Sequence, residues 1–373
     1  MHPTQLARSR LPVLGVLSPL GRAIVVGSVL VSGAAIVLDR FVRADETLVF
    51  FVAAVAILGL AWVVGLGTER LGAIAGPQVG GILNATFGNI AELIIAFFAL
   101  QAGLLDVVKA SLIGSVIGNL LLVLGASVLV GGLRHGTQRF DARIAGSNAA
   151  LLVVAAIGLF VPAIFAITVG PGVGGRRQEE SVIISILLIV GYGLSLVWQF
   201  TNPDRTLGGH GPAAGHEGPI WSGRTAVGVL VSAAVLLAVT SEILVGAIEP
   251  FVHSVGLSAF FVGVVLIPTI GNLAEHLVAV QLAAKNKMEF AMAVSFGSSL
   301  QVALFVAPVL VLLGVVIGQP MDLVFTPLEV VAVGAAVGIS ALIALDGESN
   351  WLEGALLVIV YLILAGSFFE LPG

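Results

Sequence analysis

The sequence contains no cysteine, so disulfide bridges and thiolate metal sites are excluded. Charged residues are also scarce: they make up 10% of the 373 residues, whereas 58% are hydrophobic and the mean hydropathy is +1.13. No run of basic residues could follow a phosphate backbone, which excludes nucleic acid as a partner. Ordinary soluble domains do not have this composition, and we expect the lipid bilayer to be the medium in which the chain folds.

Long apolar runs between charged or Gly/Pro-rich segments predict helices that cross a bilayer, which takes ~20 helical residues. Strands of a membrane barrel would alternate apolar and polar residues, whereas these runs are apolar on every face. The predicted fold class is therefore all-α, a polytopic membrane protein with eleven transmembrane helices. The spans are 23–39, 46–67, 78–102, 105–132, 145–168, 181–200, 222–248, 257–285, 288–317, 326–346 and 350–370.

The first apolar run also resembles a cleaved signal peptide, but its polar leader is long and contains Pro12 and Pro19, so we interpret it as a retained helix. With a cytoplasmic N-terminus, eleven Lys and Arg residues fall on the inner side and five on the outer side, as the positive-inside rule requires. The C-terminus is then outside, and we expect the plasma (inner) membrane. The outer five are Arg40, Arg43, Lys109, Arg176 and Arg177.

Residues 201–221 would form a cytoplasmic connector. This segment holds His210, His216 and Glu217 among glycines, and it is either a flexible linker or a regulatory metal site.

An internal repeat is evident, since residues 88–93 are GNIAEL and residues 271–276 are GNLAEH, at an offset of 275 − 92 = 183. The same offset relates Gly114 and Ser115 to Gly297 and Ser298. Five helix steps separate the two motifs, so the second copy enters the membrane from the opposite face. The chain is predicted to comprise residues 1–45 (leader and first helix), 46–200 (first five-helix repeat), the 201–221 connector and 222–373 (second repeat). Inverted repeats of this kind are typical of secondary transporters with a substrate site near the bilayer midplane.

Glu92 and Glu275 would lie deep in the bilayer, where an ionised carboxylate costs at least ~3 kcal/mol unless a cation, a proton or a polar cavity compensates it. Each follows an Asn by three residues and a Gly by four: Asn89 and Gly88, Asn272 and Gly271. This spacing places amide, carboxylate and bare backbone on one helical face. If the helix unwinds at the glycine, freed carbonyl oxygens can also coordinate a cation. The alternative is a hydrogen bond between neutral acids at a helix crossing.

Further polar groups recur 23 residues after each Glu. Ser115 and Ser298 stand in related G-S helices, where Gly118 and Gln301 occupy matching positions and Asn119 follows the first. Such serines either pack, with their hydroxyls bonded to the helix backbone, or line the site. All these groups supply oxygen, and a hard cation such as Ca²⁺ takes ~6–8 oxygen ligands, with two carboxylates to balance its charge. His276 follows Glu275 directly and is either a proton relay or a core histidine with a satisfied hydrogen bond.

The segments GNIAELIIAF and GNLAEHLVAV, each followed by a G-S helix, resemble the paired motifs of the CAX family of calcium/proton exchangers within the calcium:cation antiporter superfamily. The resemblance covers residues 46–370. Na⁺/Ca²⁺ exchangers carry G-S-x-x-P-E in these places, which is absent here. The resemblance to the CAX family implies Ca²⁺ export driven by protons, with Glu92 and Glu275 as the ligands that also bind protons. Asn89, Asn272, Ser115, Ser298 and Gln301 would be the accompanying polar groups. Ca²⁺ is then a transported substrate and no cofactor is implied.

Two other functions are conceivable for a polytopic membrane protein with buried carboxylates. An exchanger for Mn²⁺ or Na⁺ would use the same oxygen ligands. An intramembrane hydrolase would need a nucleophile and base or a catalytic metal, and the sequence has no G-x-G-D, H-E-x-x-H or G-x-S-x-G. We therefore expect a transporter and not an enzyme.

Overall fold

The computed structural model describes residues 14–76, 80, 83, 86–170, 174–202 and 221–371. The histidine-bearing part of the connector, with His210, His216 and Glu217, lies outside the described residues. The chain divides into two compact units. The first contains Met1–Ile95 and Pro212–Phe251, and the second contains Ala96–Gly211 and Val252–Gly373.

The described residues are helical apart from short connections and one two-residue antiparallel pair, β1 (Gln138–Arg139) with β2 (Glu348–Ser349). Ten of their helices are long and apolar enough to cross a membrane. These ten correspond to all the predicted spans except 78–102, where the described part holds only a shorter apolar helix, α4 (Ile90–Gln101). The all-α class is thus confirmed, whereas the count of eleven spans stays a prediction.

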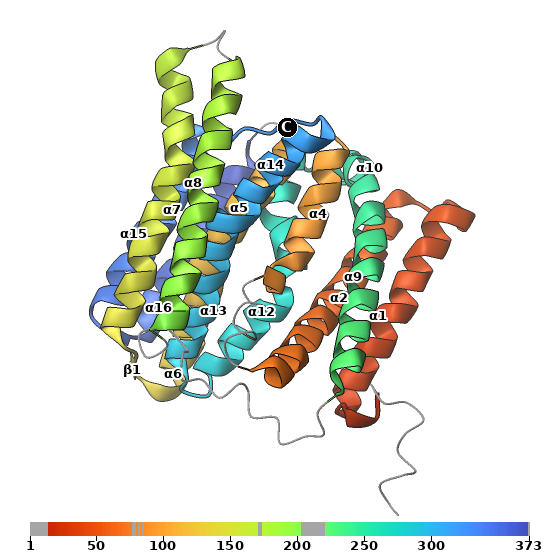
Figure 1. The fold of residues 1–373 in the computed structure, drawn as a ribbon, viewed down its shortest axis with the longest axis horizontal. Coiled ribbons are helices and arrows are strands. Elements are labelled where there is room, and N and C mark those ends of the chain that lie inside the picture. Colours follow the sequence, from red (N-terminus) through yellow and green to blue (C-terminus); the bar gives the residue numbers. More distant parts are fainter. Residues whose placement is uncertain are drawn as a thin grey trace, which may run out of the picture. The chain divides into compact units, whose positions relative to one another are not determined.

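The first unit is built on three long helices that lie side by side in Figure 1: α1 (Pro19–Val37), α2 (Glu46–Ala75) and α9 (Gly223–Gly246). α1 continues into a π-helical segment, η3 (Leu38–Val42). Glycine lets α2 approach α1 closely, since a Cβ built at Gly59 would lie 2.7 Å from Ser28. Toward α9, a Cβ built at Gly67 would lie at an ordinary contact distance of 3.4 Å from Leu230. Without an apolar driving force between helices in lipid, such close packing supplies the association energy.

α4 crosses the boundary between the units at Ile95 and Ala96, and the second unit contains most of the remaining helices. In chain order they are α5 (Leu105–Ile117), η4 (Gly118–Val123), α6 (Leu124–His135), α7 (Ala142–Val169), α8 (Gly174–Thr201), α11 (Ala259–Phe261), η6 (Val262–Leu266), α12 (Ile267–Ala283), α13 (Met288–Gln301), η7 (Val302–Val306), α14 (Ala307–Ile317), α15 (Pro327–Leu345) and α16 (Trp351–Phe369); α10 (Ile248–Val255) joins the two units. α6 and α16 pack with their backbones almost touching, since a Cβ built at Gly132 would lie 2.3 Å from the Trp351 nitrogen. A Cβ built at Gly354 would similarly lie 2.2 Å from the Leu129 nitrogen.

The ends of the helices in the second unit fall into two separate sets. At one end, Gln138 Nε2 donates to the Ala283 carbonyl (3.0 Å), His135 Nε2 bonds the Ala284 carbonyl (2.9 Å), and β1 pairs with β2. At the other, α5 and α8 bond to the connector between α14 and α15. The alternating topology predicts that these two sets of helix ends lie on opposite sides of the membrane. Which side is cytoplasmic remains a prediction.

The repeat offset also relates backbone features within the second unit. α5 begins at Leu105 and α13 at Met288, and 288 − 105 = 183. Both are preceded by a residue with positive φ, Gly103 (80°) and Asn286 (58°), and both run into a π-helical segment, η4 and η7. Sequence matches at this offset are therefore accompanied by matching local structure.

The compact units are not the same as the predicted repeats. α2 comes from the first predicted half and α9 from the second, yet they pack together in one unit. Similarly, the second unit combines α5 to α8 with α12 to α16. Two intertwined repeats would produce compact units that each contain helices from both halves of the sequence. The division of the sequence into halves at residues 200 and 222 stays a prediction.

Candidate cation site

The first carboxylate stands at a helix start. Glu92 lies in the first turn of α4 and is only 8% exposed, and Asn89 is buried in the turn just before. The Leu93 N–H donates to the Asn89 carbonyl at 3.0 Å, which ties this turn to the helix. Gly88 and Asn89 form a turn between the helical residues 86–87 and α4, so Glu92 lies in the first turn of α4, and its depth in the bilayer stays a prediction. The positive end of the α4 dipole favours a negative charge there.

The second copy of the motif has a different backbone. Gly271, Asn272 and Glu275 all lie within α12, which is helical without a break from Ile267 to Ala283. Gly271 and Asn272 are buried and Glu275 is half-buried. The structure therefore has a turn at the glycine of the first copy and continuous helix at the glycine of the second. His276 is half-buried, and its Nε2 has no hydrogen-bond partner among the described residues.

The two G-S helices meet within the second unit. Ser115 on α5, Ser298 on α13 and Asn119 in η4 are all buried, and the Asn119 amide donates to the Ser298 hydroxyl at 2.9 Å. This bond joins residues 179 apart in sequence. Gln301, at the end of α13, is half-buried. The Ser298 hydroxyl therefore accepts a hydrogen bond from a residue on another helix. This contact is compatible both with a packing role and with a place in the lining of the site.

π-helical turns follow these residues directly, since η4 begins at Gly118 and η7 begins just after Gln301. A π turn is rare and changes the hydrogen-bond register, so carbonyl groups become available to other donors. The Leu120 carbonyl in η4, for example, accepts the Ser340 hydroxyl of α15 at 3.2 Å. Such turns are frequent at functional sites. Here η4 begins where the G-S helix α5 ends, and η7 begins where the G-S helix α13 ends.

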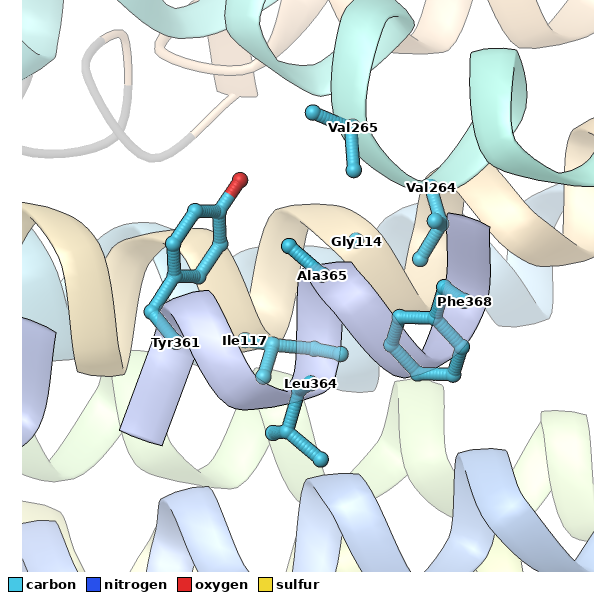
Figure 2. Close-up of a pocket in the computed structure, with 8 residues that line it drawn as sticks. All are labelled: Gly114, Ile117, Val264, Val265, Tyr361, Leu364, Ala365 and Phe368. Carbon is cyan, nitrogen blue, oxygen red and sulfur yellow. The ribbon is translucent and has the colours of Figure 1, made fainter. Parts of the chain in front are cut away.

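α5 touches η6 through glycine. A Cβ built at Gly114 would lie 2.0 Å from the Val264 carbonyl oxygen, so only glycine fits there. Figure 2 shows Gly114 and Val264 beside a small pocket, with Tyr361 and Phe368 projecting from α16; Tyr361 carries the one oxygen among the labelled side chains. Apart from Tyr361 the pocket is lined by apolar residues, and the lining includes none of the candidate carboxylates, amides or hydroxyls.

This crossing makes a prediction about stability. Gly114→Ala must push the Val264 carbonyl away, and overpacking of this kind typically costs ~1–3 kcal/mol. Gly297 is the matched control: at the same offset, a Cβ would meet nothing within 4 Å in the described part of the chain. We expect Gly114→Ala to lower the melting temperature of the purified protein and Gly297→Ala to leave it nearly unchanged. Equal melting temperatures for both variants would contradict the tight crossing.

The candidate residues are divided between the units. Gly88, Asn89 and Glu92 belong to the first, whereas Gly271, Asn272, Glu275, His276, Ser115, Asn119, Ser298 and Gln301 belong to the second. Within the second unit, the structure joins Asn119 to Ser298. The approach of Glu92 to Glu275 stays a prediction.

A charged contact in the second unit was missed by the sequence reasoning. The sequence identifies Lys109 only as one of the predicted outer positive charges. In the structure it lies in α5 and forms an ion pair with Asp322, 213 residues away. No local pattern connects two residues so far apart. The usable signal was a lysine and an aspartate within the same outer set of helix ends.

These features define a polytopic helical membrane protein with buried polar groups on repeated helices. The chain belongs to the sodium/calcium exchanger protein family, whose sequence model matches residues 46–201 and 225–369. The chain is 43% identical to a Ca²⁺/H⁺ antiporter of Aphanothece halophytica over 352 residues, which covers 90% of this chain and 93% of that protein. It is 42% identical to the Ca²⁺/H⁺ antiporter ChaA of Bacillus subtilis, covering 90% and 95%.

Solved structures agree with this assignment. The fold matches that of native YfkE with a TM-score of 0.79 at 38% identity, covering 92% of this chain and all of that one. YfkE is described as a Ca²⁺/H⁺ antiporter protein. An H⁺/Ca²⁺ exchanger, CAX, matches with a TM-score of 0.69 at 11% identity, which is a likeness of fold alone.

Proposed function

We propose that this protein exchanges Ca²⁺ for H⁺ across the membrane by alternating access between its repeats. The observation that carries the proposal is the identity of 42–44% to three Ca²⁺/H⁺ antiporters over about nine-tenths of the chain. The buried polar residues of the Asn–Glu motifs support it, because polar groups inside a membrane bundle need a functional or hydrogen-bonding reason.

In this proposal Glu92 and Glu275 bind the cation and protons in turn. Asn89, Asn272, Ser115, Ser298, Asn119 and Gln301 contribute neutral oxygens, with backbone carbonyls near Gly88 and Gly271. Carboxylate and amide oxygens are the ligands that Ca²⁺ prefers. His276 is assigned a proton-relay role because an imidazole titrates near neutral pH. The N-terminus is placed in the cytoplasm, the C-terminus outside, and the protein in the plasma (inner) membrane.

A cation panel tests the proposal. Everted vesicles that carry the protein are energised to acidify their interior, and Ca²⁺, Mn²⁺, Mg²⁺, Na⁺ or K⁺ is added in turn. We expect Ca²⁺ to release protons at the lowest concentration. A stronger response to Mn²⁺ or Na⁺ would favour the alternative exchanger, and no response to any cation would contradict cation/proton exchange.

The serines give a prediction of smaller size. Ser115→Ala and Ser298→Ala each remove one neutral oxygen, which costs on the order of 1–2 kcal/mol or roughly 5–30-fold in apparent Ca²⁺ affinity. The maximal exchange rate should be less affected because both carboxylates remain. Ser367→Ala is the matched control: its hydroxyl is exposed on α16 and bonds to the Ile363 carbonyl at 2.9 Å. Unchanged affinity in both site variants would indicate that these serines only pack.

A further inference from the structure

The connector between α14 and α15 is a non-helical segment that packs into the second unit. Met321, Leu323 and Phe325 are buried in alternation along it. Non-helical backbone in a membrane bundle needs partners for its polar groups. Side chains supply them: Gln178 Nε2 donates to the Met321 carbonyl at 3.2 Å, and the Leu323 N–H donates to the Ser181 hydroxyl at 3.0 Å.

Lys109 completes this set from α5. Its ammonium donates to Asp322 Oδ1 and, at 3.1 Å, to the Val324 carbonyl oxygen. The pair is largely shielded, with side-chain exposures of 19% for Lys109 and 29% for Asp322. The Lys109 ammonium is thus held by a carboxylate oxygen and a backbone carbonyl oxygen. Hard metal ions are bound by the same kinds of oxygen.

A second carboxylate lies nearby. Glu329 is only 3% exposed and lies within electrostatic range of Lys109 and of Asp106. One of its oxygens, Oε2, accepts the Thr326 N–H at 2.7 Å, whereas Oε1 is buried and has no hydrogen-bond partner among the described residues. A buried carboxylate without full hydrogen bonding depends on a nearby positive charge.

We propose that the Lys109 ammonium acts as a tethered cation, which holds the oxygens of Asp322 and Val324 and balances Glu329, so that the outer end of α5 is fixed to the α14–α15 connector. The role is one of positioning, since Lys109 lies outside the candidate site. The position also distinguishes the two halves: at the repeat offset, 109 + 183 = 292, the chain has the buried Met292. Removing the ammonium should leave an oxygen cluster that takes up a hard divalent cation in its place.

The test uses the full-length protein in detergent with Lys109→Met, Asp322→Asn and the double variant, all in a Glu275→Gln background that weakens the candidate central site. Melting is followed in EGTA, in Ca²⁺ and in Mg²⁺. In EGTA, both single variants should melt several degrees below their parent. The double variant should lose less than the sum of the two, because the partners act together.

Ca²⁺ provides the second readout. It should raise the melting temperature of the Lys109→Met protein, and not that of the double variant, because only the first retains the Asp322 carboxylate. Lys109→Arg should melt like the parent, since it keeps the charge. The inference is overturned if the two single losses simply add, or if Ca²⁺ stabilises parent, single and double variants equally. If Lys109→Met does not fold, the other two variants still test the proposal. An Asp322→Asn protein that melts at the parent's temperature contradicts it, and so does a Lys109→Arg protein that melts below the parent. Neither readout requires transport, so the proposed exchange can fail independently.

Discussion

Glu92→Gln and Glu275→Gln should each reduce Ca²⁺/H⁺ exchange to background while the protein remains folded in the membrane. Glutamine keeps the volume and some hydrogen bonding but removes the charge that both cation and proton need. Loss of one charged partner from a buried site typically costs ~3–5 kcal/mol, which corresponds to more than about a hundredfold in binding.

Glu242→Gln is the matched control for these variants. Glu242 is also on an apolar helix, but its side chain is 53% exposed and pairs with Arg40 at 3.2 Å. Exposed pairs contribute little, so this variant should transport normally. Proton release by everted vesicles measures all three, with membrane levels and melting temperature as checks on folding. Near-normal exchange by Glu92→Gln or Glu275→Gln would remove that residue from the central role.

The apparent Ca²⁺ affinity should fall steeply as the pH is lowered. Ca²⁺ needs both carboxylates ionised, whereas the return step needs them protonated, because two bare carboxylates close together in a low dielectric repel strongly. Protons and Ca²⁺ then compete for the same groups. With two protons displaced per Ca²⁺, the apparent dissociation constant should rise by up to about 100-fold per pH unit below the titration range of the pair.

Isotope uptake into proteoliposomes at several fixed pH values measures this dependence. Net uptake should be negligible without a proton gradient or a cation on the opposite side, since the empty, doubly charged form is held back by its desolvation cost. The Ser115→Ala protein provides a comparison: its affinity should be lower at every pH with an unchanged slope. Affinity that does not depend on pH, or Ca²⁺ uniport without proton movement, would contradict the shared-carboxylate mechanism even if both glutamates were ligands.

Much of the fold could be predicted because hydropathy depends directly on the length and composition of each apolar run. Ten predicted spans have counterparts among the described helices. Hydropathy does not report on hydrogen-bond register. The π turns at η4 and η7 consist almost entirely of apolar residues, so nothing in their composition separates them from α-helix. The turn at Gly88 and the continuous helix at Gly271 show the same limit, since nearly identical motifs adopt different backbones.

The candidate site was predictable to a similar degree. The repeat offset identified Ser298 as the match of Ser115, Asn119 was singled out as the residue after Gly118, and the structure joins Ser298 to Asn119 directly. The sequence could not predict that Asn119 would bond to Ser298, because two helices must first cross. For the same reason Lys109 was recognised only as a charge, while its partner Asp322 lies on a connector far along the chain.

The packing of α2 against α9 has a consequence for how the protein is made. α2 ends at Ala75 and α9 begins at Gly223, so α9 begins 223 − 75 = 148 positions after α2 ends. At ~5–20 residues per second, α2 emerges from the ribosome roughly 7–30 s before α9. During that interval α2 must persist as an apolar span in lipid, which its most apolar 18-residue stretch, with a mean hydropathy of 2.7, allows. A nascent chain that stops before α9 therefore lacks the third long helix of the first unit, and assembly of that unit waits until well over half of the protein has been synthesised.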